Sequence, residues 1–227
     1  MTDSKAGVVR RGFVTAARTL AVAGIVAVLS LSQAGCSSDS SGAPKYRGMP
    51  AGCPQVIGVA KVAIRQFAGE LFSEALEFES PGAQSADPSR STLECRMRYP
   101  DRRGSGVSAA LGAPATRAVN VTLVVGAGDR AVDNMRGYIV AASESAGGRP
   151  VAGLGDQAYS GVTPFSGREA AETGFRIGNA VVTVSVSGTD VTGPASATSP
   201  VPLADLGIRA TEIARVFAGD LDDLLPH

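Results

Sequence analysis

Four arginines between residues 96 and 103 are the side chains best suited to bind a charged ligand. Arg96 and Arg98 alternate with apolar residues in a strand-like segment that also carries Glu94, and Arg102 and Arg103 follow in a Gly- and Ser-rich stretch. Guanidinium groups hold phosphate oxygens in pairs, so these four residues form a candidate anion site for the phosphate of a lipid head group or a wall polymer. A solvated sheet face, with nearby acids balancing the arginines, is the plainer interpretation.

Other residue types that carry catalysis are scarce in this sequence. His227 is the one histidine, Trp is absent, and there is neither a G-x-S-x-G motif nor a phosphate-binding G-K-[ST] loop. Acidic clusters at residues 70–79 and 220–223 lack calcium-loop spacing, and the few aromatic residues offer little for stacking sugars. We therefore predict that the protein is not an enzyme and uses no cofactor or metal.

The composition allows a folded domain and argues against a nucleic acid partner. Of 227 residues, 44% are apolar and 19% are charged, and the 21 basic residues balance 21 acidic ones to a formal net charge of +0. That apolar fraction is enough for a globular core. The charge balance leaves no basic excess to bind nucleic acid.

The first 35 residues have the pattern of an export signal. A positively charged start, which includes the pair Arg10-Arg11, precedes an uncharged apolar run over residues 19–31. As a helix this run would span roughly 20 Å, short of the ~30 Å hydrocarbon core, so a signal peptide is favoured over a transmembrane anchor. Arg10-Arg11 also fits the twin-arginine export motif, and this route and the general secretory route both stay open.

Cys36 closes a segment that resembles a bacterial lipobox, the site at which a cysteine takes a diacylglyceryl thioether before cleavage. Ala34 and Gly35 are the small residues this motif needs, whereas Gln33 stands where an aliphatic residue is usual. We predict lipidation of Cys36 and, with a second acyl group such as palmitate, stable anchoring on the extracytoplasmic face of the cell membrane. Ordinary cleavage nearby, leaving a free thiol, is the alternative.

Cys53 and Cys95 remain after Cys36 is assigned to lipid. Export would deliver them to an oxidising compartment, where a pair of cysteines is most simply one disulfide. Closing a loop of roughly 40 residues stabilises a fold by ~4 kcal/mol in the chain-entropy description. A redox or metal role would need a C-x-x-C motif or additional histidines.

The remaining chain is predicted to be a spacer followed by a single domain. Residues 36–50 are rich in Ser, Gly and Pro and predict a flexible tether with a reach of ~20 Å. The domain over residues 51–227 shows helical periodicity near residues 52–67, 132–142 and 206–224, and strand alternation near residues 76–79, 93–99, 119–125, 157–159 and 175–187. This order favours an α+β fold, a mainly antiparallel sheet with about three packed helices. Residues 81–91 and 188–202 are predicted loops.

Several of these features occur together in a known family. Cys53 precedes a helix, Cys95 lies on a strand, and the segment Val151-Ala-Gly-Leu-Gly-Asp-Gln-Ala158 comes before a Val-rich hairpin and a final helix. The combination resembles a family of uncharacterised actinobacterial envelope lipoproteins that carry a C…C pair and a V-x-G-L-G-D-x-A segment. The likeness covers most of the chain after Cys36, although Arg96-Met97 stands where that family often has a Trp. It implies an exported α+β domain and no established activity.

The glycines of this segment also invite comparison with a phosphate loop. Gly153-Leu-Gly155-Asp156 lacks the third glycine and the strand–helix context of such a loop. We therefore predict a tight turn in which the Asp156 carboxylate accepts hydrogen bonds from nearby backbone amides.

Two functions are consistent with these observations. The first is a non-catalytic binding or scaffolding module that recognises another envelope protein or a wall polymer. The second is a carrier of lipid or another apolar ligand, held in a cavity between the sheet and the helices. A continuous apolar cavity would favour the carrier, and a filled core with an exposed apolar or arginine-rich patch would favour the binding module.

Overall fold

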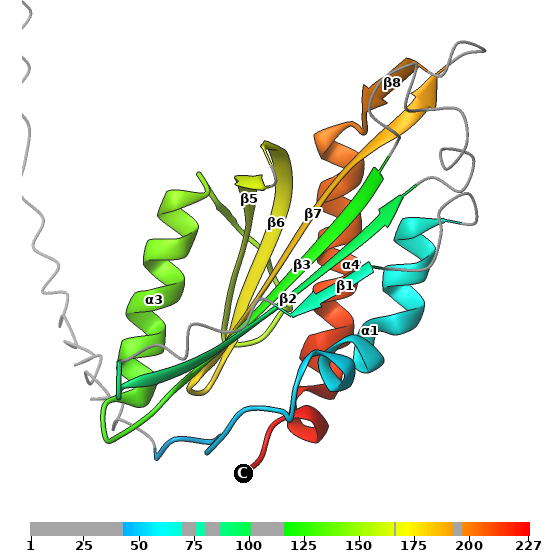
Figure 1. Cartoon of the computed structure of the whole chain (residues 1–227). Coiled ribbons are helices and arrows are strands. Elements are labelled where there is room, and N and C mark those ends of the chain that lie inside the picture. The colour runs from blue at the N-terminus through cyan, green and yellow to red at the C-terminus, as the bar shows by residue number, and fades with distance from the viewer. Residues whose placement is uncertain (1–42, 70–75, 80–86, 101–115, 166, 193–196) are drawn as a thin grey trace, which may run out of the picture. The chain divides into compact units, whose positions relative to one another are not determined.

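The computed structural model describes residues 43–69, 76–79, 87–100, 116–165, 167–192 and 197–227, and Figure 1 shows the chain as a cartoon. Three helices lie in the described residues: α1 (Cys53–Ala68), α3 (Ala131–Ser145) and α4 (Leu203–Leu224). The strands are β1 (Leu76–Glu79), β2 (Arg90–Pro100), β3 (Thr116–Gly126), β4 (Arg149–Pro150), β5 (Gln157–Phe165), β6 (Arg168–Ile177), β7 (Ala180–Thr192) and β8 (Ala197–Pro200). The predicted export signal, Cys36, Arg102 and Arg103 lie outside the described residues.

The strands form one antiparallel sheet in the order β1-β2-β3-β7-β6-β5-β4, and β8 pairs with the last residues of β7. Every strand pair in this sheet is antiparallel. β6 and β7 are joined by a two-residue turn, because Ile177 pairs with Ala180 across Gly178-Asn179. The prediction of an α+β fold with an antiparallel sheet and three helices is confirmed.

The predicted loop over residues 188–202 is wrong for much of its length. β7 continues to Thr192, and β8 returns along it with Thr189 opposite Pro200. The sequence hid these strands because Gly188, Thr189 and Asp190 break the apolar alternation. β5 and β6 are also longer than predicted, reaching to Phe165 and back to Arg168.

Side chains alternate between two faces of the sheet, and the helices divide between those faces (Figure 1). We call one face the α1–α4 face, because buried residues such as Val121, Val184 and Phe175 pack there against α1 and α4. The other is the α3 face, where Val124 and Val181 pack against α3. Of the described helices, α3 is the one on that face.

Helix α1 buries one regular apolar stripe, whose members repeat at spacings of three and four residues: Val56, Ile57, Ala60, Ile64, Phe67 and Ala68. Val59 and Ala63, beside this stripe, are only partly buried. Ala60 lies at a kink, with φ of −102° and ψ of 17°. The helix predicted near residues 52–67 is therefore present, with its apolar stripe against the core.

One end of the sheet, which we call the attachment end, holds the first described residues of the chain. Tyr46 is buried there, its N–H donates to Asn179 Oδ1 (2.9 Å), and Asn179 Nδ2 donates to the carbonyl oxygens of Tyr46 and Gly126 (2.8 Å each). The Arg47 N–H donates to the Pro226 carbonyl oxygen at 2.9 Å. These two residues, which composition placed in the tether, therefore pack against the body.

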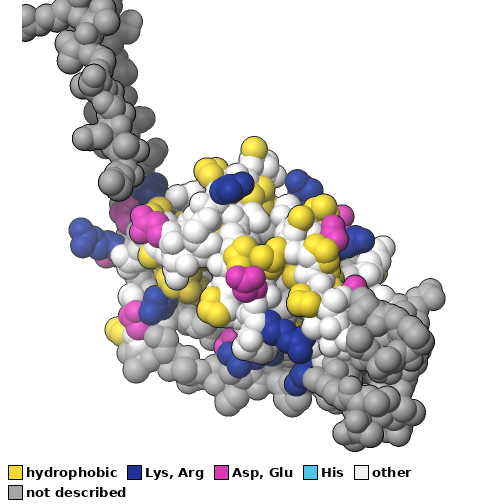
Figure 2. Space-filling view, turned by 90° about the horizontal axis from the view of Figure 1, so that it is seen from above, with side chains coloured by type: hydrophobic (Ala, Val, Ile, Leu, Met, Phe, Trp, Pro, Cys, Tyr) yellow, Lys and Arg dark blue, Asp and Glu magenta, His cyan; other side chains and the backbone are white. Residues whose placement is uncertain are grey.

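The opposite end of the sheet contains the last residues of β2 and β7 and the first residues of β3 and β6. It lies at the top of Figure 1, away from the C-terminus, and Figure 2 looks onto the molecule from that side. From Gly126 to Ala118 along β3 the two ends are separated by ~26 Å, at about 3.3 Å per residue.

Candidate anion-binding site

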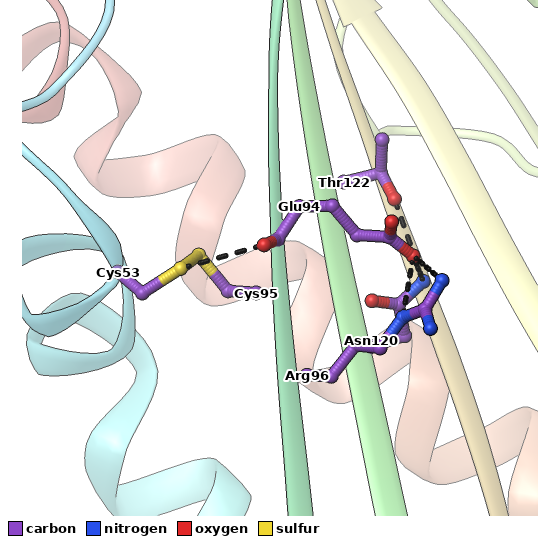
Figure 3. The surroundings of a disulfide bond; sticks show 6 residues. All are labelled: Cys53, Glu94, Cys95, Arg96, Asn120 and Thr122. Atoms are coloured by element: carbon purple, nitrogen blue, oxygen red, sulfur yellow. Dashed lines mark hydrogen bonds and ion pairs between the residues drawn. A yellow bond between two sulfur atoms is a disulfide. The ribbon is translucent and has the colours of Figure 1, made fainter. Parts of the chain in front are cut away.

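The structure places two of the four predicted anion ligands on the α3 face. Figure 3 shows the Cys53–Cys95 disulfide on one side of β2, and Glu94 and Arg96 reaching away on the other. Arg98 follows Arg96 by two residues and shares that face. The disulfide itself, with Cα atoms 5.4 Å apart, is present as predicted and ties α1 to β2.

Arg96 is largely neutralised by its neighbour. Its Nη2 lies 2.8 Å from Glu94 Oε1, and its Nε donates to the same oxygen at 2.9 Å. Asn120 Nδ2 donates to that oxygen as well, at 3.0 Å (Figure 3). This part of the cluster matches the plainer interpretation of arginines balanced by nearby acids.

Arg98 stands beside a depression of about 250 Å³ that we call the arginine pocket. Its lining consists of Arg96, Met97, Arg98, Thr116, Ala118, Phe165, Arg168 and Ser187. The register explains this grouping, since Ala118 is paired with Arg98 on one side and with Ser187 on the other. The pocket thus draws on β2, β3, β7 and the adjoining ends of β5 and β6.

Arg168 is a member of the pocket that sequence reasoning missed. It is the first residue of β6, and it pairs with Phe165 of β5. Local sequence gave no sign of its role, because β6 was expected to begin near Phe175. The strand pairing, rather than any motif, brings it to the same depression as Arg98.

Arg98 and Arg168 belong, with Arg47, Arg130, Arg149 and Arg215, to the arginines for which no ion pair is found within the described residues. Within the described residues, no carboxylate lies within ion-pair distance of either one. The arginines that do form ion pairs there are Arg90, Arg96, Arg117, Arg136, Arg176 and Arg209. The pocket therefore has positive charge that this part of the chain does not neutralise.

The floor of the pocket is small and polar. Ala118, Ser187 and Thr116 are buried, with 8%, 3% and 8% of their surface exposed. Small side chains leave room above the sheet, and two hydroxyl groups add donors to those of the arginines. Such a site can hold an oxyanion through several hydrogen bonds at once.

Beside the pocket, on the same face, lies a hydrogen-bonded network around Glu172. Tyr159 Oη donates to Glu172 Oε1 at 2.7 Å, and Ser185 Oγ donates to Oε2 at 2.8 Å. Burial, and then the charge of Glu172, raise the pKa of Tyr159, which keeps its hydroxyl protonated. Each carboxylate oxygen of Glu172 therefore holds one hydroxyl group, which fixes the positions of Tyr159 and Ser185.

Another depression, of about 540 Å³, lies between the end of α1 and the start of α4. Its walls include Arg117, Asp190, Asp205, Arg209 and Glu212. Arg117 forms an ion pair with Asp190 and lies over the Phe67 ring, 5.7 Å from its centre. A space with so many charged walls does not suit an apolar ligand.

The predicted turn at residues 153–156 is confirmed. Gly153 and Gly155 have φ of 71° and 63°, the left-handed region that glycine adopts without strain. Asp156 Oδ2 accepts a hydrogen bond from the Gly178 N–H at 2.8 Å and lies 3.1 Å from Arg176 Nη1. The carboxylate therefore ties this turn to the turn between β6 and β7.

The described residues contain no group of three or more His, Cys, Asp or Glu side chains that could hold a metal ion. None of the helices among them is both long and apolar enough to cross a membrane.

Comparison with known proteins gave no match to a protein-family model, a curated protein or a solved structure. The resemblance to envelope lipoproteins, drawn from short motifs, thus stays a prediction.

Proposed function

We propose that this protein is an exported, lipid-anchored protein of the cell envelope whose α+β body is a non-catalytic binding module. The observation that carries the proposal is the arginine pocket, where the Arg98 and Arg168 guanidinium groups have no acidic partner among the described residues. Unneutralised charge above a polar floor favours recognition of an anionic ligand.

The placement of reactive groups supports binding rather than catalysis. His227 belongs to the attachment end, where its ring centre lies 5.5 Å from that of Tyr46 and its Nε2 lies 3.2 Å from the Asp222 carbonyl oxygen. Both oxygens of Glu172, on the α3 face, are occupied by hydroxyl donors. The described residues that line the pocket include hydroxyl groups but no carboxylate or imidazole that could activate them.

The attachment end fits a role in anchoring. Lys45 Nζ lies 2.6 Å from Asp222 Oδ1, and the Tyr46 hydroxyl donates to the same oxygen at 2.5 Å. These contacts fix the chain to the body about nine residues after Cys36, a length that spans at most ~30 Å. A lipid on Cys36 would hold this end of the sheet close to the membrane.

The carrier hypothesis has less support. Phe175, Phe217 and Ile213 fill the space between the sheet and α4. The depressions described above have charged walls. We therefore retain the binding module as the proposed function.

Anchoring is tested by fractionating cells that express the full chain or its Cys36→Ala variant. We expect wild type in the membrane fraction and the variant in the soluble fraction, since the lipid groups carried by Cys36 account for attachment. An Arg18→Ala variant controls for effects of altering the leader. An unchanged membrane fraction for Cys36→Ala would contradict the proposal.

Native mass spectrometry of the mature protein, purified from the envelope, distinguishes the binding-module hypothesis from the carrier hypothesis. A mass that exceeds the lipidated chain by that of a further lipid, lost on denaturation, would favour the carrier. A mass equal to the lipidated chain, together with cross-links to an envelope component, would support the binding module.

A further inference from the structure

We propose that the arginine pocket binds phosphate groups of a phosphate-bearing polymer above the membrane, rather than head groups of the membrane that holds the protein. This inference rests on the proposed function, because it assumes anchoring through Cys36. Charge, shape and position each support it separately.

The charge of the pocket favours phosphate. Arg98 and Arg168 approach the depression from strands on opposite sides of β3 and β7, and Arg96 lies beside them. Guanidinium forks that approach from two sides can bind the tetrahedrally arranged oxygens of one phosphate, whereas the two oxygens of a carboxylate lie in one plane. Two cations without acidic partners in the described residues therefore suit a phosphate better than a carboxylate.

The shape of the pocket fits a phosphate within a chain. Between the two arginines the floor is formed by Ala118 and Ser187, both buried. Phe165 stands at the edge of the same depression and offers an apolar surface. A site of about 250 Å³ with hydroxyls, guanidiniums and one ring can hold a phosphate together with the carbon backbone on either side of it.

The position of the pocket directs it away from the membrane. It lies at the end of the sheet opposite the attachment end, where Tyr46 and Asn179 fix the incoming chain. Figure 2 looks onto this opposite end and shows Lys and Arg side chains interspersed with acidic and apolar ones. A mixed surface of this kind gives little attraction to an anionic bilayer as a whole, so the attached end stays nearest the membrane.

The experiment measures polymer binding to the full lipidated protein in nanodiscs of phosphatidylcholine. The probe is fluorescent poly(glycerol phosphate), a chain of phosphodiesters, and the readout is fluorescence anisotropy. Two further conditions complete the design: polyglutamate of equal charge as probe, and nanodiscs that contain phosphatidylglycerol.

We expect saturable binding of poly(glycerol phosphate) that weakens as salt is added. Each of Arg98→Gln and Arg168→Gln should weaken it about tenfold, and the double variant about a hundredfold, as loss of charged hydrogen bonds predicts. Arg136→Gln is the matched control, since Arg136 lies on α3, is exposed and pairs with Asp133. This control should bind as wild type does.

Three results would overturn the proposal. Binding that is unchanged in the double variant would exclude the pocket as the site. Equal affinity for polyglutamate would exclude selection of phosphate. Loss of polymer binding in phosphatidylglycerol nanodiscs, with wild-type binding in phosphatidylcholine, would show that head groups of the same membrane occupy the pocket.

Failure of the pocket assignment can be distinguished from failure of the proposed function. The Arg98→Gln/Arg168→Gln variant should fractionate with the membrane as wild type does, because it keeps Cys36. If Cys36→Ala stays in the membrane while polymer binding depends on the arginines, the anchoring proposal fails and the pocket assignment survives. If Cys36→Ala leaves the membrane fraction while polymer binding is unchanged in the double arginine variant, only the pocket assignment fails.

Discussion

Along β2 and β3, one face of the sheet is apolar and the other carries charged and amide groups. Cys95, Met97 and Val121 point toward α1 and α4 and are at most 1% exposed, whereas Arg96 and Asn120, their neighbours on the same strands, point to the α3 face. The α3 face becomes apolar only toward the attachment end, where α3 covers it.

This difference predicts separate tasks for the two faces. A face that is mostly apolar stabilises the fold by removing area from water. A face of arginines, amides and hydroxyls gains little from burial, since each polar group needs a partner. The α1–α4 face should therefore govern stability, and the part of the α3 face that α3 leaves uncovered should govern binding.

The largest expected effect concerns the disulfide on the α1–α4 face. Replacing both Cys53 and Cys95 by Ala should lower the free energy of unfolding by ~4 kcal/mol, because the unfolded chain regains the freedom of a long loop. Chemical denaturation measures this loss. Wild type treated with reductant should match the double variant, and a wild type insensitive to reductant would contradict the assignment.

A smaller loss should follow from a substitution under α3. A Cβ on Gly174 would lie closer than 3.0 Å to the Tyr159 ring, so Gly174→Ala must displace a buried side chain. The expected cost is about 2 kcal/mol of the free energy of unfolding. Thermal unfolding measures it.

Gly137→Ala, on α3 itself, is the matched control for that substitution. Nothing lies within 4 Å of the added Cβ, so helix propensity should make the protein more stable by about 0.5–1 kcal/mol. Equal effects of the two changes would show that Tyr159 is not fixed over the strand.

The third effect depends on pH. Burial, together with the Asp222 carboxylate that accepts its hydrogen bond, raises the pKa of Tyr46 from 10.0 to about 12. The folded state therefore keeps this proton to a higher pH than the unfolded state, in which the tyrosine pKa is near its ordinary value. The resulting stability is complete below about pH 10 and is lost as the pH rises through about 12.

Tyr46→Phe tests this dependence. The variant should lose about 1 kcal/mol at pH 8, since one hydrogen bond to Asp222 disappears. Its stability should also fall less steeply than that of wild type as the pH rises from about 10 to about 12. Tyr138 and Tyr159, whose pKa values burial also raises, keep their part of the fall in this variant. A fall as steep as that of wild type would contradict the assignment to Tyr46.

Local patterns were enough to predict much of this fold. Strict alternation around Cys95 and Val121 predicted two strands, and Gly178-Asn179 between apolar runs predicted the hairpin of β6 and β7. Both depend on residues close together in sequence. The same is true of the final helix, whose apolar stripe from Leu206 to Leu224 is buried as predicted.

The candidate site was predicted only in part, because it depends on pairing between distant strands. Arg96 and Arg98 were found from their own strand, but Arg168 joins them only through the register of β3, β7 and β6. Likewise, the contact of Tyr46 with Asn179 joins residues 133 positions apart and has no local signal. Sequence spacing alone cannot show which residues meet across a sheet.

The smallest expected effect on stability is at the arginine pocket. Arg98→Gln/Arg168→Gln removes two exposed cations that have no acidic partner in the described residues. The free energy of unfolding should therefore stay within about 0.5 kcal/mol of wild type, which chemical denaturation checks with the same protocol as for the disulfide.

Either result at this pocket bears on the separation of tasks between the two faces. A loss above about 1 kcal/mol would mean that the two arginines stabilise the sheet, and the separation would fail. A stability equal to wild type, or slightly above it as repulsion between the cations is relieved, would show that this charge is not kept for folding. The polymer-binding measurement then decides whether this charge serves binding.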